Sequence, residues 1–120
     1  MKNRTIIGVF LLTNHMKFVR IVIMELDVPI KYRKDIENAT FLLKNEGCKD
    51  VYLFGSLVTG RINENSDIDI GVKGLPRRKF LKLYSKLYFD FDNKIDLVDF
   101  DRNEDFYSIL NDLGEVIQIG

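Results

Sequence analysis

Four short runs of apolar, β-branched and aromatic residues alternate with helical patterns, and this alternation restricts the fold more than any other feature. The runs lie at 50–55, 68–72, 94–100 and 115–119. Runs of this length and composition are typical of strands. Strands that alternate with helices predict an α/β fold, here with one four-stranded sheet and helices packed mostly on one of its faces.

Three helices are predicted, at about 30–46, at about 77–90, and from a cap at Asp101 or Asn103 to a stop at Gly114. Each has apolar residues at the spacing of one helix face. The expected buried residues are Ile36, Ala39, Thr40 and Leu43 in the first helix, Phe80, Leu81, Tyr84, Leu87 and Tyr88 in the second, and Phe106, Ile109, Leu110 and Leu113 in the third.

The first 23 residues raise a separate question. The apolar run 6–12 follows a basic start, as in a signal peptide, but polar and charged residues interrupt the segment soon afterwards and no small-residue cleavage site follows. The run is also too short to cross a bilayer. We therefore expect neither a signal nor an anchor. An alternative is that translation begins at Met24, in which case 1–23, with His15, is an extension outside a domain at 24–120.

Length and charge narrow the possible classes of protein. A chain of 120 residues can bury the core of one domain, and we expect no second domain. Lysine plus arginine and aspartate plus glutamate both number 18, a balance that favours neither direct nucleic acid binding nor binding to a membrane surface. The single cysteine, Cys48, cannot close an intramolecular disulfide, which fits the cytoplasm. We expect Cys48 to be a small apolar residue that fills space at a helix end.

Two aspartates at the second strand need an explanation. Asp67 and Asp69 project from one face, about 7 Å apart along the chain, while Ile68 and Ile70 point to the core. Close carboxylates repel each other, and burying one without a partner costs several kcal/mol. A divalent cation would remove both costs, and hard oxygen ligands suit Mg²⁺ or Mn²⁺ better than zinc. The alternative is an exposed strand edge that uses aspartate freely.

Gly55 and Ser56 directly follow the first strand. The missing side chain and the free backbone N–H groups at the start of a helical turn would form a cradle for phosphate oxygens. The alternative is a plain turn at a strand end. A phosphate cradle joined by one loop to a carboxylate pair is more specific than either half. Transfer of a nucleotidyl group from a metal-bound triphosphate requires this combination.

The combined motif resembles the signature of the DNA polymerase beta nucleotidyltransferase superfamily, and specifically its minimal nucleotidyltransferase (MNT) members. The motif is Gly55-Ser56, ten residues, then Asp67-Ile68-Asp69, and the resemblance covers about 31–119. It implies a two-layer nucleotidyltransferase fold with a small mixed four-stranded sheet and helices mainly on one face. It also implies a third carboxylate on a neighbouring strand with apolar flanks, which fits the run 94–100.

Two aspartates in that run are candidates for the third carboxylate. Asp96 and Asp99 have opposite parity, so only one of them can face the metal site. The family pattern places the carboxylate early in the strand, which selects Asp96. Asp99 and Asp101 then lie near the strand end, where solvated carboxylates and a helix cap are the expected roles.

The loop before Asp67 supplies two further nucleotide-binding candidates, Arg61 and Ser66. Related proteins often carry an arginine immediately before the loop glycine, whereas here Thr59 precedes Gly60 and the arginine follows it. Arg61 is a candidate contact to the triphosphate, with a surface role as the alternative. This departure concerns substrate binding and not the three carboxylates.

The resemblance implies a mechanism with two Mg²⁺ ions, for which Mn²⁺ could substitute. Asp67 and Asp69 would hold both ions. Asp96 would bind the second ion and is a candidate general base, and Gly55 with Ser56 would hold the leaving pyrophosphate. ATP is the expected donor. Stand-alone MNT proteins pair with a HEPN-type toxin and silence it by adenylylating a tyrosine, so the resemblance implies a protein adenylyltransferase that acts as an antitoxin.

Two other classes of function stay open. One is a non-catalytic module that binds nucleotide or masks a partner protein. Three clustered carboxylates disfavour this class, because no structural need explains them. The other is a small-molecule nucleotidyltransferase, which is disfavoured because we expect no domain to bind the acceptor.

Overall fold

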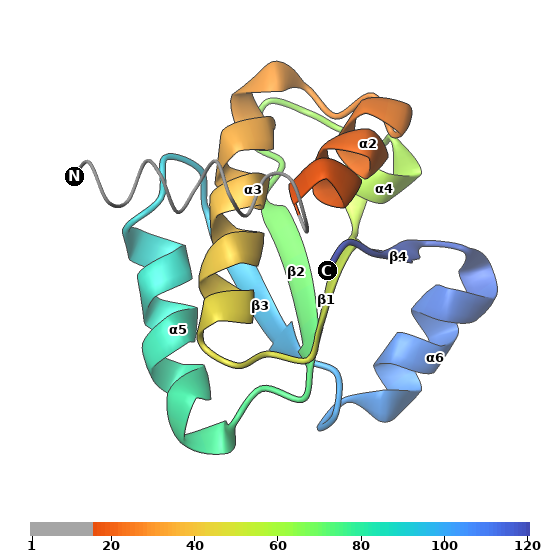
Figure 1. Ribbon diagram of the computed structural model, residues 1–120. Helices are drawn as coiled ribbons and strands as arrows, with labels where there is room; N and C mark the ends of the chain where they lie inside the picture. Colours follow the sequence, from red (N-terminus) through yellow and green to blue (C-terminus); the bar gives the residue numbers. More distant parts are fainter. Residues whose placement is uncertain (1–15) are drawn as a thin grey trace.

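A single mixed sheet forms the centre of the molecule (Figure 1). The computed structural model describes residues 16–120, so the run 6–12 and His15 lie outside the described residues. The sheet has the strand order β3-β2-β1-β4, in which β1 is antiparallel to β2 and β4, and β2 is parallel to β3. The expected mixed four-stranded sheet is confirmed. The strands are β1 (Asp50–Phe54), β2 (Ile68–Lys73), β3 (Ile95–Asp99) and β4 (Val116–Gln118).

The helices divide unequally between the two faces of the sheet. Buried residues of α2, α3, α4 and α5 join one core with the strands, and Leu110 of α6 belongs to a second, smaller cluster on the other face. Helices mainly on one face were expected, and this is confirmed. The helices are α2 (Lys17–Glu25), α3 (Ile30–Asn45), α4 (Ser56–Thr59), α5 (Arg77–Phe89) and α6 (Glu104–Leu113).

Alternation along β1 explains the two clusters. Val51 and Leu53 point into the core shared with α2 to α5, whereas Tyr52 and Phe54 point the other way. The second cluster is aromatic, and Phe100 lies at its centre with ring centroids 5.5 Å from both Tyr52 and Phe54. Successive strand residues face opposite sides, so one short strand supplies both cores.

The packed structure extends to residues before Met24. Val19, Val22 and Ile23 of α2 are buried in the main core. The expected domain boundary at residue 24 therefore does not coincide with the edge of this core, and a chain that began at Met24 would lack these side chains. Of the helices in residues 16–120, none is long and apolar enough to cross a membrane.

Two helices bury a different face from the one expected. In α5, Leu81 is 75 % exposed and Leu83 is buried instead, because Leu83 shares the face of Leu87. In α6, only Leu110 of the four expected residues is buried. The reason is that, within residues 16–120, α6 packs only on the three-residue β4 and a small aromatic cluster, which together cover one row of its side chains.

Other expectations about the core are confirmed. All four residues expected for the buried face of α3 are buried. Cys48 is buried at the end of that helix, and burial raises the pKa of its thiol to about 11. A thiol with this pKa is protonated at neutral pH, which agrees with an inert filler.

The role of α2 can be tested by a matched pair of substitutions in the full chain. Ile23 is 1 % exposed and Ile21 is 55 % exposed on the same helix. We expect Ile23→Ala to lower the free energy of unfolding by about 2–4 kcal/mol, because it leaves a cavity in the core. Ile21→Ala should change it by less than about 0.5 kcal/mol. Urea unfolding measures both, and equal small effects would mean that α2 does not belong to the folded core.

Candidate active site

Two of the predicted carboxylates lie side by side on adjacent strands. Asp69 of β2 is the register partner of Asp96 of β3, and its partner on the other side is Phe54 of β1. Ile68 and Ile70 point into the main core, so Asp69 projects from the opposite face, the one that carries α6. The same alternation places Asp96 on that face, because Ile95 and Leu97 are in the core.

The environment of Asp69 disfavours its negative charge. Burial, together with the negative charges of Asp96 and Asp67, raises the pKa of the Asp69 carboxyl to about 6. Desolvation and neighbouring like charges both favour the neutral form of a carboxylic acid. In this arrangement a negative charge lacks compensation, and a cation placed between the carboxylates would supply it.

Asp67 lies just before β2 and faces a lysine. The Nζ of Lys94 is 3.9 Å from an oxygen of Asp67 and 4.8 Å from the centre of the Tyr88 ring. A hydrogen bond with Tyr88, and then the nearby negative charges, raise the pKa of Lys94. The sequence prediction missed Lys94, although its position two residues before Asp96 places it on the same strand face.

Gly55 leaves room for the carboxylate of Asp69. A Cβ atom at this position would collide with the side chain of Asp69, and φ is +77° with ψ −150°. Glycine is essentially the only residue that adopts this backbone region. Gly55 is the N-cap of the one-turn helix α4, which has no side-chain cap, and Ser56 is its first residue. The structure therefore places the Gly-Ser turn directly against Asp69, one member of the acidic pair.

Helix α3 fixes the two loops that lead into the acidic strands. The hydroxyl of Tyr32 donates a hydrogen bond of 3.0 Å to the carbonyl oxygen of Ser66, just before β2. The backbone and side-chain N–H groups of Asn93 donate to the carboxylate of Asp35 at 2.7 and 2.9 Å, just before β3. Tyr32 and Asp35 are buried, so these bonds connect the site rigidly to the main core.

The remaining predicted site residues have less direct positions. The Ser66 hydroxyl oxygen accepts a hydrogen bond of 2.9 Å from the Asn63 N–H, which orders the loop. Arg61 is exposed, and the five ion pairs found within residues 16–120 do not include its side chain. Nucleotide binding by Ser56, Arg61 and Ser66 stays a prediction.

Asp99 and Asp101 lie away from the acidic pair. Asp99 is buried, not solvated as expected, and its carboxylate accepts the Asp101 N–H at 3.0 Å. Asp101 in turn accepts the Gly74 N–H at 2.7 Å. Both carboxylates stabilise the turn between β3 and α6. The cap of α6 is Asn103, without a side-chain capping bond.

The donor set suits a hard divalent cation. Asp67, Asp69 and Asp96 offer only carboxylate oxygens, which Mg²⁺ and Mn²⁺ prefer. Within the described part of the chain, no three acidic, histidine or cysteine side chains are already arranged as a metal cage. A cation bound by all three aspartates would have to compete with Lys94 for Asp67. The unbalanced charge at Asp69 fits such a cation, although the identity of the ligands stays a prediction.

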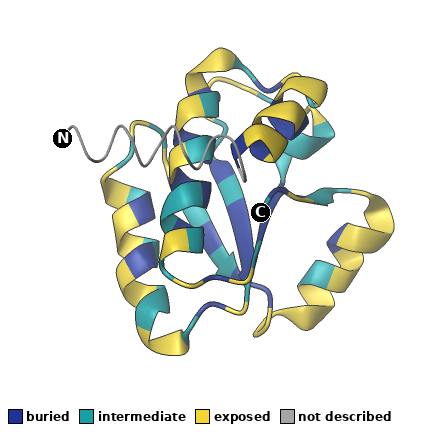
Figure 2. Cartoon of the chain, in the orientation of Figure 1, coloured by how far each residue is buried: buried dark blue, intermediate teal, exposed yellow. Residues whose placement is uncertain are grey.

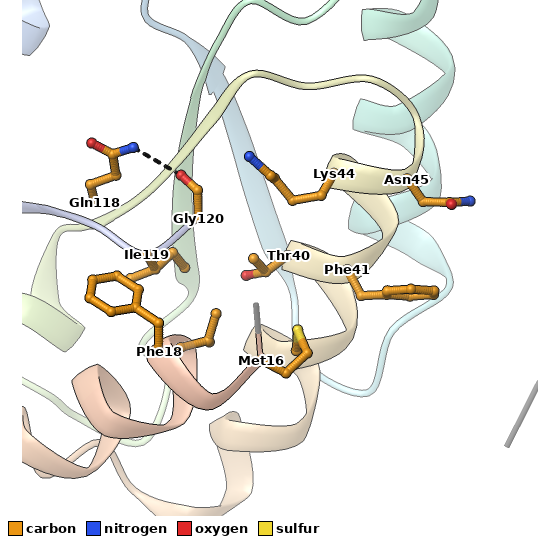
Figure 3. Close-up of a pocket in the computed structure, with 10 residues that line it drawn as sticks. Met16, Phe18, Thr40, Phe41, Lys44, Asn45, Gln118, Ile119 and Gly120 are labelled. Carbon is orange, nitrogen blue, oxygen red and sulfur yellow. Dashed lines mark hydrogen bonds between the residues drawn. The ribbon is translucent and has the colours of Figure 1, made fainter. Parts of the chain in front are cut away.

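A separate pocket lies on the helical side of the sheet (Figure 3). It has a volume of about 510 Å³, and α2, α3 and the C-terminal residues line it. Next to it, Gln118 donates a hydrogen bond of 3.0 Å to the Gly120 carbonyl. The pocket contains none of the three site aspartates, and it borders Met16, where the described residues begin. We therefore assign it no ligand.

A mixed sheet with a Gly-Ser turn against an acidic pair defines the class of nucleotidyltransferase folds. The family model for polymerase beta, nucleotidyltransferase, matches residues 34–117. The chain belongs to this family, and the resemblance drawn from the motif is confirmed. The match includes β1, β2 and β3 and all three of the aspartates.

Two solved structures resemble the chain over about two thirds of its length. A crystal structure of a toxin–antitoxin with AMP-PNP is 30 % identical, with a TM-score of 0.54, and the match covers 69 % of this chain and 71 % of that one. A crystal structure of a toxin–antitoxin MntA-HpeT mutant is 27 % identical, with the same TM-score of 0.54 and coverage of 69 % and 70 %. A search of curated proteins found no significant match. These similarities support an MntA-like member of the family.

Burial of Asp69 and the repulsion from its neighbours make the stability of the fold depend on pH. The carboxyl has a pKa of about 6 in the folded protein and 3.8 without the fold, so the folded state binds the proton more tightly. The loss of folding stability that comes from ionising Asp69 is therefore absent below pH 3.8 and complete above about pH 6. In chelator, we expect Asp69→Asn to be more stable than the parent by about 1–2 kcal/mol at pH 8, a value discounted for partial exposure. Urea unfolding at pH 4 to 8 should show this difference vanish at low pH, and a constant difference would contradict it.

Gly55→Ala tests the contact between the turn and Asp69, with Gly47→Ala as its control. Both glycines have positive φ, but a Cβ at Gly47 meets no atom within 4 Å. We expect each substitution to lower the free energy of unfolding by about 1–3 kcal/mol through backbone strain. Only Gly55→Ala should also abolish the rise in melting temperature on addition of Mg²⁺, because it displaces the carboxylate. Equal responses to Mg²⁺ would argue against the placement of the site.

Proposed function

We propose that this protein is a Mg²⁺-dependent nucleotidyltransferase that transfers AMP from ATP to a tyrosine of a HEPN-type toxin and thereby acts as its antitoxin. The observation that carries the proposal is the pairing of Asp69 with Asp96 against the open Gly55 turn. This arrangement has an uncompensated negative charge next to a backbone turn suited to phosphate oxygens. A metal-bound nucleoside triphosphate matches both features.

The related structures support a nucleotide and a protein partner. Their crystals contain toxin–antitoxin proteins, one with AMP-PNP, which is an analogue of ATP. The other carries a mutant in which two aspartates, two positions apart, are both replaced by glutamate. Asp67 and Asp69 have the same spacing in this chain. The HEPN type of the partner and the tyrosine acceptor come from the family resemblance.

The residues of this chain divide into two groups by their role in the reaction. Asp67, Asp69 and Asp96 would hold the cations, and the backbone of Gly55 and Ser56 would bind the phosphates of the leaving group. A bound divalent cation would neutralise the phosphate charge and orient the triphosphate. Burial and repulsion together raise the pKa of Asp69, and a bound cation would compensate the charge that both disfavour. Substrate binding and stability of the fold would then be coupled.

The chemistry would proceed on the open face of the sheet. The acceptor hydroxyl oxygen forms a bond to the α-phosphorus, and the bond between that phosphorus and pyrophosphate breaks. The hydroxyl proton passes to the Asp96 carboxylate, the candidate general base. The tyrosine then carries AMP, and pyrophosphate leaves the site.

Labelled ATP tests this proposal directly. The full chain is incubated with α-labelled ATP, Mg²⁺ and the purified product of the adjacent gene, and label on that protein is measured. We expect the parent to transfer label, and Asp67→Asn, Asp69→Asn and Asp96→Asn to lose at least about 100-fold in rate, the scale of removing one catalytic group. Asp92→Asn, in an exposed loop, is the matched control and should transfer as the parent does.

The outcomes separate the alternatives. Tight binding of the partner without any label would identify a non-catalytic masking module. Label on a small molecule but not on the protein would identify a small-molecule nucleotidyltransferase. Full activity of Asp69→Asn would refute the role of the acidic pair.

A further inference from the structure

Helix α6 carries an apolar stripe that the sheet leaves uncovered. Phe106, Ile109 and Leu113 follow one another at helical spacing and are 41 %, 57 % and 63 % exposed. We call these three residues the α6 stripe. The outer side of α6 is largely exposed in Figure 2. Single exposed apolar residues are ordinary, but a row of three large ones on one helix face is typical of an interaction surface.

The α6 stripe adjoins the acidic pair. The ring of Phe106 packs edge to face against that of Phe54, with 5.6 Å between the ring centroids. Phe54 is the register partner of Asp69. α6 packs on β4 and on the aromatic cluster of Tyr52, Phe54 and Phe100, and Asp69 and Asp96 project from the same sheet face. A protein that covers the carboxylates from outside therefore also meets α6.

The charges around the α6 stripe identify its occupant. The chain from Asn103 to Gln118 contains Glu104, Asp105, Asp112 and Glu115 and no lysine or arginine. Two basic residues lie nearby: Arg102 precedes this segment, and the Nζ of Lys73 lies 3.6 Å from the ring centroid of Tyr107 on α6. The acids outnumber them. None of these four acids takes part in the ion pairs found within residues 16–120. Complementary charge favours a partner surface whose apolar residues are bordered by lysine and arginine. A second copy would bring two acidic borders together, because a two-fold interface pairs a surface with itself.

We propose that the α6 stripe is the docking surface for the acceptor protein, which presents apolar side chains bordered by basic residues. This proposal rests on the proposed function, since docking here would carry the acceptor hydroxyl to the face of Asp69 and Asp96. The apolar stripe supplies the binding energy, and the acidic border selects the partner and its orientation. Docking and transfer thus use neighbouring parts of one sheet face.

Paired substitutions on α6 test the proposal in the full chain, with the purified product of the adjacent gene as the probe. Ile109→Lys with Leu113→Lys removes the apolar contact and places positive charge against a basic border. Ile109→Glu with Leu113→Glu removes the same contact but keeps the sign of the border. Leu81→Lys, at a leucine of α5 that is 75 % exposed, is the control. Phe106 stays unchanged because it packs against Phe54.

We expect the lysine pair to weaken the affinity for the probe at least tenfold, about the loss expected for an interface hot spot. The glutamate pair should lose less, and Leu81→Lys should stay within about twofold of the parent. Calorimetry with the probe measures these affinities. Binding of AMP-PNP with Mg²⁺ and the melting temperature should be unchanged in every variant, because α6 does not supply site residues.

Unchanged affinity in both pairs would overturn the docking surface, as would a parent chain that does not bind the probe. Equal losses of affinity in the two pairs would overturn the inference that basic residues border the partner's surface. A parent that sediments as a dimer, and that the lysine pair converts to a monomer without loss of probe affinity, would assign the stripe to a second copy. Failure of the proposed function is distinguishable, because the parent would then bind the probe through α6 and transfer no label.

Discussion

The parallel pairing of β2 with β3 brings Asp69 and Asp96 side by side, and the rest of the site depends on this repulsive contact. Lys94 balances Asp67 but leaves the pair itself uncompensated. Gly55 keeps the space next to Asp69 free of a side chain. The fold thus holds two like charges together and stays open on the side from which a cation with phosphates would approach. Like charges this close destabilise the folded state unless a bound cation compensates them.

The two faces of the sheet have different roles. One face is closed by α2, α3, α4 and α5 around a continuous apolar core, which supplies stability. The other face carries a small aromatic cluster and the carboxylates, and α6 is the one helix of residues 16–120 that packs on it. Burial on one side therefore permits exposure of polar chemistry on the other, because the short strands have alternating side chains. Gly71 belongs to this open face, and the ring of Phe100 fills the space that a side chain there would take.

The strands could be predicted from local period, and parity allowed only one of Asp96 and Asp99 to share the face of Asp69. The mixed sheet and the choice of Asp96 came from the family resemblance, and the role of Asp96 as a ligand stays a prediction. The sequence was insufficient where tertiary packing decides. Leu81 and Leu83 both fit a helical pattern, and only the position of the sheet selects Leu83. The apolar spacing along α6 predicts a buried stripe, but the sheet is too narrow to cover it. The bonds from Tyr32 to Ser66 and from Asp35 to Asn93 span 34 and 58 positions, which no local pattern encodes.

The bonds from α3 to the loops before β2 and β3 have a consequence for the lifetime of the protein. Because Ser66 and Asn93 are held by buried residues, the loops cannot swing apart to separate the charges. The repulsion therefore lowers the stability of the whole domain, and a ligand bound at the site would restore it. Since proteases act on transiently opened chains, a molecule without ligand would be degraded sooner than one with its site filled. The abundance of the protein in a cell would then report how often its site is occupied.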